Sequence, residues 1–474
     1  MLAVDWLIVA CLGCILLLSV AQGQEGGSRE IGSRLELMVD DWLIERMDGV
    51  RLELNHPVPR EIALVFDKPW EGSTCCYVTV FRDNDLFRMY YRGSDYDIPT
   101  QKSTHPELAC YAESRDGITW TRPNLGLFEF GGSKDNNIVW TGVGSHNFTP
   151  FKDANPDCAA DAKYKGFVGG EGGLLPIKSP DGIHWELMQD TPVITLGDFD
   201  SQNLAFWDTE RKCYVDYHRR GRNGVRDIMT CTSQDFINWT EPVYLDYGDT
   251  PPEHLYTNAI TQYHRAPHFL VGFPKRFVPE RVAVEHPYPG VSDGVFMSSR
   301  DGVNFKRWTQ AFIRPGLQKE RWVNRNNMTA WGILETAPAE EGLPPELSVY
   351  SSESYYMPGN RIRRFTLRLD GFVSARAGYP AGEMLTRPLV FAGNRLVLNY
   401  ATSAAGSVKV EVQDPAGNAI PGFALADCEP LYGDEIAGAV KWTGGPDLGA
   451  LAGQPVRLRF VMMDADVYSL QFQE

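Results

Sequence analysis

The sequence predicts an all-β protein, built as a five-bladed β-propeller followed by a C-terminal β-sandwich. Three observations predict this fold class. A short pattern recurs four times along the chain, and short alternating strands rich in Tyr, Phe, Val and Ile lie between its copies. No segment keeps a helical period long enough for a major helix. Beyond residue 384 the composition shifts to Ala, Gly and Val and the pattern stops.

The recurring pattern has the form Ser-x-Asp-(Gly)-β-branched-x-aromatic. Its copies are Ser114-Arg-Asp-Gly-Ile-Thr-Trp120, Ser179-Pro-Asp-Gly-Ile-His-Trp185, Ser233-Gln-Asp-Phe-Ile-Asn-Trp239 and Ser299-Arg-Asp-Gly-Val-Asn-Phe305. A repeat of about 50 to 70 residues is typical of a propeller, in which each copy marks one blade. Because Asp-Gly favours a tight turn, we expect each copy to be a hairpin between two strands and to have a structural role.

Each copy sits within the same predicted unit: strand, polar turn, aromatic-rich strand, marker hairpin and outer strand. Five such units fill residues 24–384, and the last contains a degenerate marker, Leu369-Asp-Gly-Phe372. Residues 39–44 are expected to supply the strand that closes the ring. Residues 385–474 are expected to form the sandwich domain. Its predicted strands are 395–400, 408–413, 440–442, 456–462 and 467–472.

The N-terminal segment predicts a signal peptide. Residues 6–20 are apolar and precede Ala21-Gln22-Gly23, a small-x-small cleavage site, so residues 1–23 are expected to be removed. The protein is then secreted or periplasmic, without stable membrane insertion. Asp5 and the lack of an early Lys or Arg depart from the usual leader. The alternative is a short membrane anchor, although the run is short for a span.

Net charge and cysteine spacing indicate which classes of partner and cofactor the protein does not use. The net charge of −16 argues against nucleic acid or an anionic membrane surface as a partner. Cys11 and Cys14 fall in the leader, and the other cysteines are scattered without a disulfide pattern. No His or Cys spacing matches a zinc site. No cofactor is therefore expected; a structural calcium ion on the axis is compatible with the fold, and nothing in the sequence requires it. The oligomeric state is not predicted.

The markers are similar to the Asp-boxes of sialidases. The whole arrangement resembles the glycoside hydrolase family 32/43 superfamily of five-bladed propellers. A closer resemblance is to secreted, glycosidase-like proteins of planctomycete-type bacteria. It is carried by Val39-Asp-Asp-Trp-Leu-Ile44, Lys68-Pro-Trp-Glu71, Tyr111-Ala-Glu-Ser-Arg-Asp-Gly117 and Leu367-Arg-Leu-Asp-Gly-Phe372. The resemblance implies a secreted glycoside hydrolase acting on a plant or algal polysaccharide or oligosaccharide.

The sequence departs from this superfamily at the catalytic motifs. The invertase-like Trp-x-Asn-Asp-Pro-Asn, Arg-Asp-Pro and Glu-Cys motifs are missing, and the nearest strings are Lys152-Asp-Ala-Asn-Pro156 and Glu253-His254. The family's catalytic residues therefore do not transfer. Asp153 is expected to lie in a hairpin turn at the opposite end of its strand from the catalytic funnel.

Candidate site residues follow from the blade register, because polar residues just ahead of each innermost strand face the central funnel. Glycoside hydrolysis needs two carboxyl groups. We expect Glu253 to be the general acid, with Asp200 and Glu71 as alternatives for base or nucleophile. The expected substrate-binding residues are His254, Tyr256, Asn258, His146, Asn147, Gln202, Arg325 and Asn326.

Several of these assignments remain open. Arg325 suits a charged group such as an acidic sugar, and Lys275-Arg276 belongs to a basic stretch that is either a solvated turn or a site for an anionic glycan. The main alternative function is a non-catalytic carbohydrate-binding propeller that has lost one carboxylate. A lyase or a sialidase-like enzyme is a third hypothesis, but a sialidase needs three axial arginines and Arg325 alone stands out.

Overall fold

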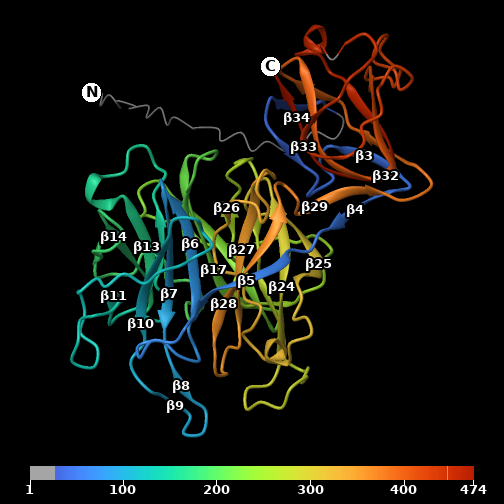
Figure 1. The fold of residues 1–474 in the computed structure, drawn as a ribbon. Helices are drawn as coiled ribbons and strands as arrows, with labels where there is room; N and C mark the ends of the chain where they lie inside the picture. Colours follow the sequence, from blue (N-terminus) through green and yellow to red (C-terminus); the bar gives the residue numbers. More distant parts are fainter. Residues whose placement is uncertain (1–26, 446) are drawn as a thin grey trace, which may run out of the picture.

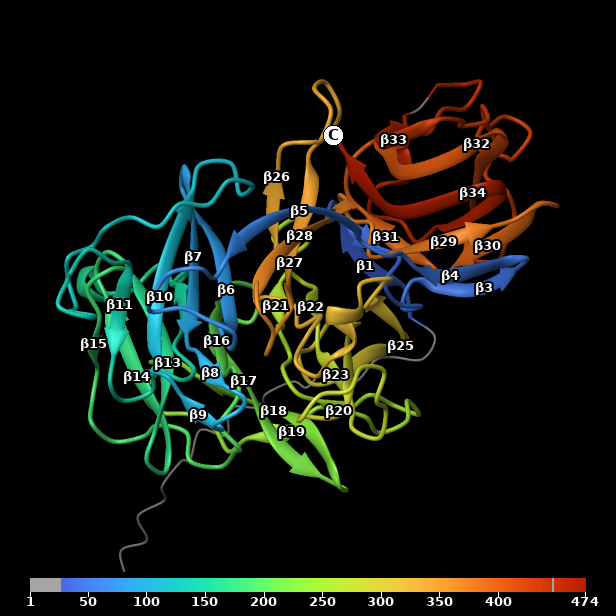
Figure 2. The ribbon, with the colours of Figure 1, turned by 60° about the horizontal axis from the view of Figure 1, so that its bottom comes forward.

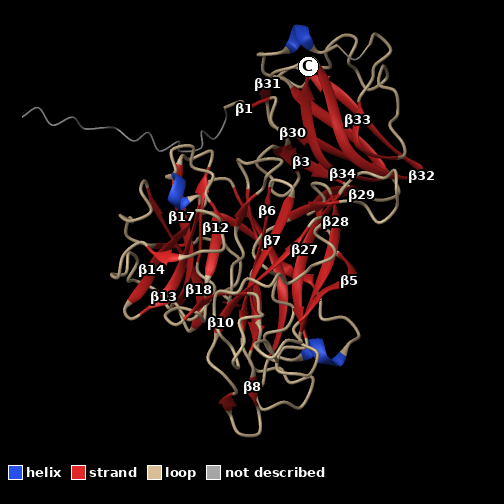
Figure 3. Ribbon diagram, turned by 60° about the vertical axis from the view of Figure 1, so that its left-hand side comes forward, coloured by secondary structure: helices blue, strands red, loops and turns tan. Residues whose placement is uncertain are grey.

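The computed structural model describes residues 27–445 and 447–474 and is built almost entirely of β-strands (Figures 1 and 3). The predicted leader, residues 1–23, lies outside this part of the chain. The helical segments of the described residues are three short 3-10 turns: η1 (Ala160–Ala162), η2 (Lys319–Trp322) and η3 (Gly449–Leu451). No helix in residues 27–445 and 447–474 has the length and apolar character to cross a membrane.

Five antiparallel sheets form the five blades of a propeller, which confirms the predicted fold class. Blade one contains β6 (Cys76–Asp83), β7 (Leu86–Gly93), β10 (Leu108–Ser114) and β11 (Ile138–Thr141), with the small hairpin β8 (Tyr96–Asp97) and β9 (Lys102–Ser103) between β7 and β10. Blade two contains β12 (Thr149–Lys152), β13 (Tyr164–Gly170), β14 (Gly173–Ser179) and β15 (Glu186–Leu187).

The remaining blades follow the same order from axis to rim. Blade three contains β16 (Leu204–Asp208), β17 (Cys213–Arg222), β18 (Val225–Ser233) and β19 (Val243–Tyr244). Blade four contains β21 (Thr261–Gln262), β22 (Leu270–Gly272), β24 (Val291–Ser299) and β25 (Phe305–Ile313), extended by β20 (His254–Leu255) and β23 (Lys275–Val278). Blade five contains β26 (Leu334–Thr336), β27 (Glu346–Glu353), β28 (Arg361–Arg368) and β5 (Val58–Val65).

The ring is closed by β5, which comes from the N-terminal part of the chain and pairs antiparallel with β28. The expectation that residues 39–44 close the ring is wrong. Ile44 begins β3 (Ile44–Asp48), which pairs instead with β30 (Gly382–Thr386) outside the propeller. The apolar side chains of this segment are buried on two sides: Val39 packs in a cluster with residues of blades four and five, and Leu43 packs in the core of the second unit.

The second β unit takes strands from both ends of the chain (Figure 2). Its sheet runs β3-β30-β34-β29-β4, with β2, β32 and β33 attached, and β1 pairs in parallel with β31. The bounds are β1 (Arg29–Gly32), β2 (Glu36–Leu37), β4 (Val50–Leu54), β29 (Val373–Ala377), β31 (Leu389–Phe391), β32 (Arg395–Gln413), β33 (Asp434–Ala439) and β34 (Arg457–Gln473).

Sheet membership therefore does not follow the expected division at residue 384. Strands β2, β3, β4 and β29 belong to the second sheet although they lie within residues 24–384, and β30 crosses the boundary. The two pairs of strands predicted at 395–413 and 456–472 are the single long strands β32 and β34. A separate hydrophobic core fills this unit, including Trp442, Phe460 and Phe472. The sandwich expected for residues 385–474 stays a prediction.

The markers are hairpin turns, as predicted, and all four have the same hydrogen bonds. The serines Ser114, Ser179, Ser233 and Ser299 each end the third strand of a blade. The serine Oγ accepts the N–H of the residue three positions later at 2.8–2.9 Å. One oxygen of each aspartate accepts the backbone N–H groups of the residues two and three positions later, at 2.7–2.9 Å. Because these hydrogen bonds join residues close together in the chain, the turns can be predicted from a short sequence pattern.

Each marker also fastens its blade to the preceding one. The Tyr90 hydroxyl of blade one donates to the Gly182 carbonyl at 2.8 Å, and Tyr217 of blade three donates to Gly302 at 2.9 Å. Tyr350 of blade five makes the same bond to Gly117 of blade one. The third marker has Phe236 where the others have glycine, and the facing residue of blade two is Phe167, whose ring stacks on Phe236 at 4.9 Å.

Candidate functional site

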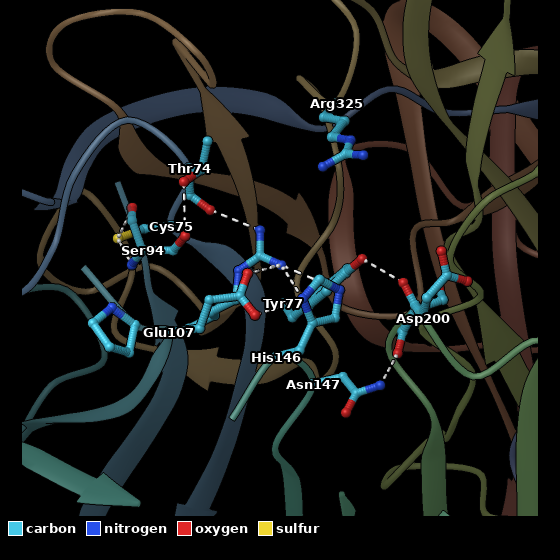
Figure 4. A network of polar contacts seen from close by, with 12 residues as sticks. Thr74, Cys75, Tyr77, Ser94, Glu107, His146, Asn147, Asp200 and Arg325 are labelled. Carbon is cyan, nitrogen blue, oxygen red and sulfur yellow. Dashed lines mark hydrogen bonds and ion pairs between the residues drawn. The ribbon is translucent and has the colours of Figure 1, made fainter. Parts of the chain in front are cut away.

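The candidate site is a polar network at the end of the propeller axis where the innermost strands begin (Figure 4). We call it the axial network and define it by Tyr77, Arg92, Glu107, His146, Asp200, Arg219 and Tyr256. These residues come from blades one to four and from the connections between them. They converge because every blade presents the start of its first strand and the end of its second strand at the same end of the axis.

Two tyrosines lie at the centre of the network. The Tyr77 and Tyr256 hydroxyl oxygens are 2.7 Å apart, and the Tyr77 hydroxyl also donates to the backbone carbonyl oxygen of Asp200 at 3.1 Å. Both tyrosines are almost fully buried and pack with Cys76, Met328 and Tyr355 in one cluster. Tyr77 adopts a φ of +52°, a left-handed conformation that L-residues seldom adopt. Such a residue is held in place by its surroundings, here the hydroxyl contacts.

Glu107 and His146 form a carboxylate–imidazole pair beside Tyr77. The His146 Nδ1 atom lies 2.8 Å from Glu107 Oε2, and the His146 ring packs against Tyr77 at 5.5 Å between centroids. The buried Arg92 guanidinium lies 3.4 Å from the other Glu107 oxygen. Burial alone would raise the pKa of Glu107, but the His146 contact and the Arg92 charge outweigh it and hold the pKa below its ordinary value. Glu107 is therefore a carboxylate at neutral pH.

Asp200 presents the most accessible carboxylate of the network. Its side chain is 72% exposed, while Arg219, its ion-pair partner, is 9% exposed. The residue that follows Asp200 is held by two hydrogen bonds. Ser201 Oγ donates to the Tyr256 carbonyl at 2.7 Å, and Asn147 Nδ2 donates to the Ser201 carbonyl at 3.1 Å. A rigid backbone under an exposed carboxylate suits a group that acts on a ligand.

Positive charge surrounds the Tyr256 ring. The charged groups of Lys275, Arg219, Arg226 and Arg325 lie 4.3, 5.3, 5.8 and 5.8 Å from the ring centroid. Cations placed this close to an aromatic face are attracted by its quadrupole. Burial of Lys275, together with the charges of Arg325 and Arg226, lowers the pKa of its ammonium well below the ordinary value.

Four of the residues predicted from sequence meet at this site. Asp200, Tyr256 and His146 belong to the axial network, and Arg325 borders it through a 3.0 Å bond to the Tyr355 hydroxyl. Four predicted amides instead support the backbone. Their side chains bond to main-chain groups in the following pairs: Asn147 with Gly169, Gln202 with Val78, Asn258 with Tyr217 and Asn326 with Tyr355.

The structure places Glu253 and His254 apart from these contacts. The Glu253 carboxylate is held by Arg276 at 3.0 Å and by Arg307, and it lines a surface cavity of about 390 Å³ between blades three and four. His254 Nδ1 accepts the backbone N–H of Arg226 at 3.1 Å. Burial and the Arg226 charge lower the pKa of His254, so its imidazole is neutral at pH 7.

Glu71 is also engaged elsewhere. Its side chain is buried, accepts two bonds from Arg122 at 2.8 and 2.9 Å and accepts the Tyr91 hydroxyl at 2.5 Å. Arg122 follows the first marker, on the outer side of blade one. In these contacts Glu71 joins two parts of the propeller, and none of them reaches Asp200.

Sequence reasoning missed much of the network because it counted only residues ahead of the innermost strands. Arg92, Arg219 and Lys275 follow or end the second strands, and Glu107 and Arg226 lie at the starts of the third strands. Those positions reach the same end of the axis. The dense run Arg219-Arg-Gly-Arg222 is a signal that could have drawn attention to it.

Metal chemistry has no ready ligand set here. Within residues 27–445 and 447–474, no three His, Cys, Asp or Glu side chains are grouped to hold a metal ion.

Comparison with known proteins gives structural similarity alone. No family model matches the chain, and no curated protein matches its sequence. A solved structure described as a glycoside hydrolase is 16% identical, covers 66% of this chain and 92% of its own, and has a TM-score of 0.43. An α-L-arabinofuranosidase from Clostridium thermocellum is 13% identical. The match covers 63% of this chain and 92% of the arabinofuranosidase chain, with a TM-score of 0.41.

The catalytic domain of an α-L-arabinofuranosidase of family 62 from Coprinopsis cinerea is 10% identical. It covers 67% of this chain and 96% of its own, with a TM-score of 0.39. At these identities and scores, the similarity assigns neither an activity nor a substrate to the chain.

Proposed function

We propose that the axial network binds a saccharide and hydrolyses a glycosidic bond, in a secreted or periplasmic enzyme acting on plant or algal glycans. The observation that carries the proposal is the placement of two acid–base groups on one face. The exposed Asp200 carboxylate and the Glu107–His146 pair lie on either side of Tyr77. Glycoside hydrolysis needs one group to protonate the leaving oxygen and a second to activate water or attack the sugar.

The contacts suggest a role for each group. Glu107 remains ionised, and its carboxylate, 2.8 Å from His146 Nδ1, orients the imidazole. His146 is 38% exposed and is the group that transfers the proton to the leaving oxygen. Asp200 is the base or nucleophile on the opposite side. This differs from the expected acid–base set, in which Glu253 gives the proton and Asp200 or Glu71 completes the pair.

An aromatic surface beside the network supports saccharide binding. Tyr288 and Tyr356 stack at 4.7 Å, and the Tyr96 and Tyr288 hydroxyls are 2.8 Å apart. These half-buried tyrosines come from three separate connections, in blades one, four and five. Aromatic faces with polar edges suit the alternating apolar and hydroxylated surfaces of sugar rings.

The test is hydrolysis of a panel of plant and algal glycans by wild type, Asp200→Asn, His146→Asn and Glu107→Gln. Each variant is expected to lose about 10²- to 10⁴-fold in kcat while the protein stays folded. Asp190→Asn, which changes an exposed aspartate of the propeller rim, is the control for an equal change of charge. Glu253→Gln separates the two acid assignments. Full turnover in Asp200→Asn and His146→Asn, with loss in Glu253→Gln, would overturn the roles proposed for the axial network.

A second candidate function is carbohydrate binding without catalysis. Asp200 and Glu107 are both already paired with arginines, and this favours a site that holds a ligand without transferring protons. Calorimetry with the same glycans distinguishes the two functions. Binding by wild type with no detectable hydrolysis, and unchanged affinity in Asp200→Asn, would support the binding protein.

A further inference from the structure

Lys275 is a buried lysine without a carboxylate partner. It begins β23, is 1% exposed, and its polar contact is the Asn324 side-chain oxygen at 3.4 Å. Within residues 27–445 and 447–474, no carboxylate forms an ion pair with it. Lys165, the other buried lysine in this part of the chain, is paired with Asp153 and bonded to Tyr214. A buried ammonium is normally paired in this way, because removal from water is costly.

Arg226 and Arg325 lie beside Lys275 and also lack carboxylate partners among the described residues. Arg226 contacts His254 Nδ1 at 3.4 Å, and Arg325 contacts the Tyr355 hydroxyl at 3.0 Å. Arg325 has a φ of +65°, so its backbone is held in an unfavourable conformation. Neighbouring Arg219 and Arg92 differ, because they are paired with Asp200 and Glu107.

We name Lys275, Arg226 and Arg325 the cation cluster. All three lie within 5.8 Å of the Tyr256 ring, in a protein whose net charge is −16. Three basic side chains at one place disfavour each other's charged forms, and no carboxylate pairs with them among the described residues. Their charges also contribute to the low pKa of the Lys275 ammonium. An anion bound among them would remove this unfavourable interaction.

We infer that the saccharide bound at the axial network carries an anionic substituent, a carboxylate or a sulfate ester, which the cation cluster recognises. This inference rests on the proposed function only in taking the ligand to be a saccharide. Guanidinium groups bind carboxylate and sulfate oxygens through paired N–H donors, and the ammonium adds a point charge. The Tyr256 ring contacts both the cation cluster and Arg219, the ion-pair partner of Asp200, so it sets the spacing between the anionic group and the Asp200 carboxylate.

The test measures binding, so it gives a result whether or not the protein is a hydrolase. The probes are trigalacturonate, the neutral trisaccharide made by reducing its carboxyl groups, and a sulfated neutral trisaccharide, each titrated into wild type at low salt. We expect at least one charged probe to bind about 10- to 100-fold more tightly than the neutral one, and the advantage to shrink as salt is added. The two charged probes show whether a carboxylate or a sulfate is preferred.

Charge-removing variants locate the preference. Lys275→Met, Arg226→Gln and Arg325→Gln are each expected to lose most of it while keeping the affinity for the neutral trisaccharide. Lys134→Met, which removes an exposed lysine of blade one, is the matched control and should keep the full preference. Arg226 is only half-buried, so Arg226→Gln gives a readout even if Lys275→Met does not fold.

Two results would overturn the inference. One is equal affinity of wild type for the neutral and both charged probes. The other is a preference for a charged probe that survives in Arg226→Gln and Arg325→Gln. A charged-probe preference that depends on the cation cluster, in a protein without hydrolytic activity, would keep this inference while removing the hydrolase function.

Discussion

The Tyr77 hydroxyl lies 2.7 Å from the Tyr256 hydroxyl and joins blade one to the start of blade four across the propeller axis. Tyr77 gives its proton to the Asp200 carbonyl, so Tyr256 must be the donor between the two tyrosines. The chain of bonds therefore runs from Tyr256 through Tyr77 to the backbone of Asp200. This chain of bonds holds the backbone of Asp200 and thereby positions its exposed carboxylate.

This direction predicts unequal effects for two matched substitutions. Tyr77→Phe removes both bonds and leaves the Asp200 carbonyl unpaired, so it should lower the free energy of unfolding by about 2 kcal/mol and reduce kcat. Tyr256→Phe removes one bond and should cost about 1 kcal/mol. Urea unfolding and turnover on the best glycan measure both effects. A larger loss in Tyr256→Phe than in Tyr77→Phe would contradict the bond direction.

Glu71 offers a test between a catalytic and a structural carboxylate. It is buried against Arg122 and Tyr91, so Glu71→Gln should leave Arg122 with only the exposed Asp67 at 3.5 Å as an ionic partner and lower the free energy of unfolding by about 3 kcal/mol. Turnover per folded molecule should stay near the wild-type value. The catalytic role suggested by the sequence gives the opposite pattern: normal stability with a large loss of kcat. Chemical unfolding and active-protein concentration, measured on the same sample, decide between them.

The sequence located part of the site because blade register is local information. His146, Asp200, Tyr256 and Arg325 precede their strands at fixed places relative to the hairpins, so counting back from each turn finds them. The direction of a carboxylate is not local. Glu71 and Glu253 also stand ahead of strands or near them, but Arg122 and Arg276 bind them through contacts that a single sequence does not reveal.

In the third marker, Phe236 and its neighbour Phe167 are expected to depend on each other for stability. Phe236 has a φ of +68° where the other copies have glycine, and it stacks on Phe167 where the other copies face a tyrosine hydroxyl. Phe236→Gly should destabilise by about 2 to 4 kcal/mol, because lost packing exceeds the relieved backbone strain. Phe167→Tyr alone should cost about 1 to 3 kcal/mol by forcing a hydroxyl against the Phe236 ring.

The double variant should be more stable than the sum of the two changes predicts, because the hydroxyl introduced by Phe167→Tyr then reaches the carbonyl of a glycine, as the hydroxyls of Tyr90 and Tyr217 do. A coupling free energy of about 1 to 3 kcal/mol is expected from a double-mutant cycle measured by urea unfolding. Additive effects would show that the third marker does not share the geometry of the others.

The same contrast between local and distant information applies to the fold. The four hairpins are built by bonds within a few residues, so their pattern predicted the blades. The pairing of β5 with β28, and of β3 with β30, joins segments far apart in the chain. Sequence patterns identify strands in these segments without naming partners. The small residues near Ala404 lie between the strands predicted at 395–400 and 408–413, whereas β32 continues through them with a shift in register.

Glu36 provides the last prediction, on the connection between the second sheet and the propeller. It lies in β2 with a fully buried side chain, and contacts Arg300 at 2.9 Å and His268 at 3.3 Å, both from blade four. Burial alone would raise the pKa of Glu36, but the His268 contact and the charges of Arg300 and Arg34 lower it from 4.5 to about 2.

A carboxyl group with a lowered pKa stabilises the folded state fully above its unfolded pKa, and this contribution is lost as the pH falls toward the folded pKa. For Glu36 the window is therefore from about pH 4.5 down to about 2, and the contribution is on the order of 3 kcal/mol. Urea unfolding of wild type and Glu36→Gln should show a difference in free energy that shrinks by about 2 kcal/mol between pH 6 and pH 3. Glu30→Gln, at an exposed glutamate of β1, should show no such change. A difference for Glu36→Gln that stays constant over this range would mean that Glu36 is not an ionised link between the sheet and blade four.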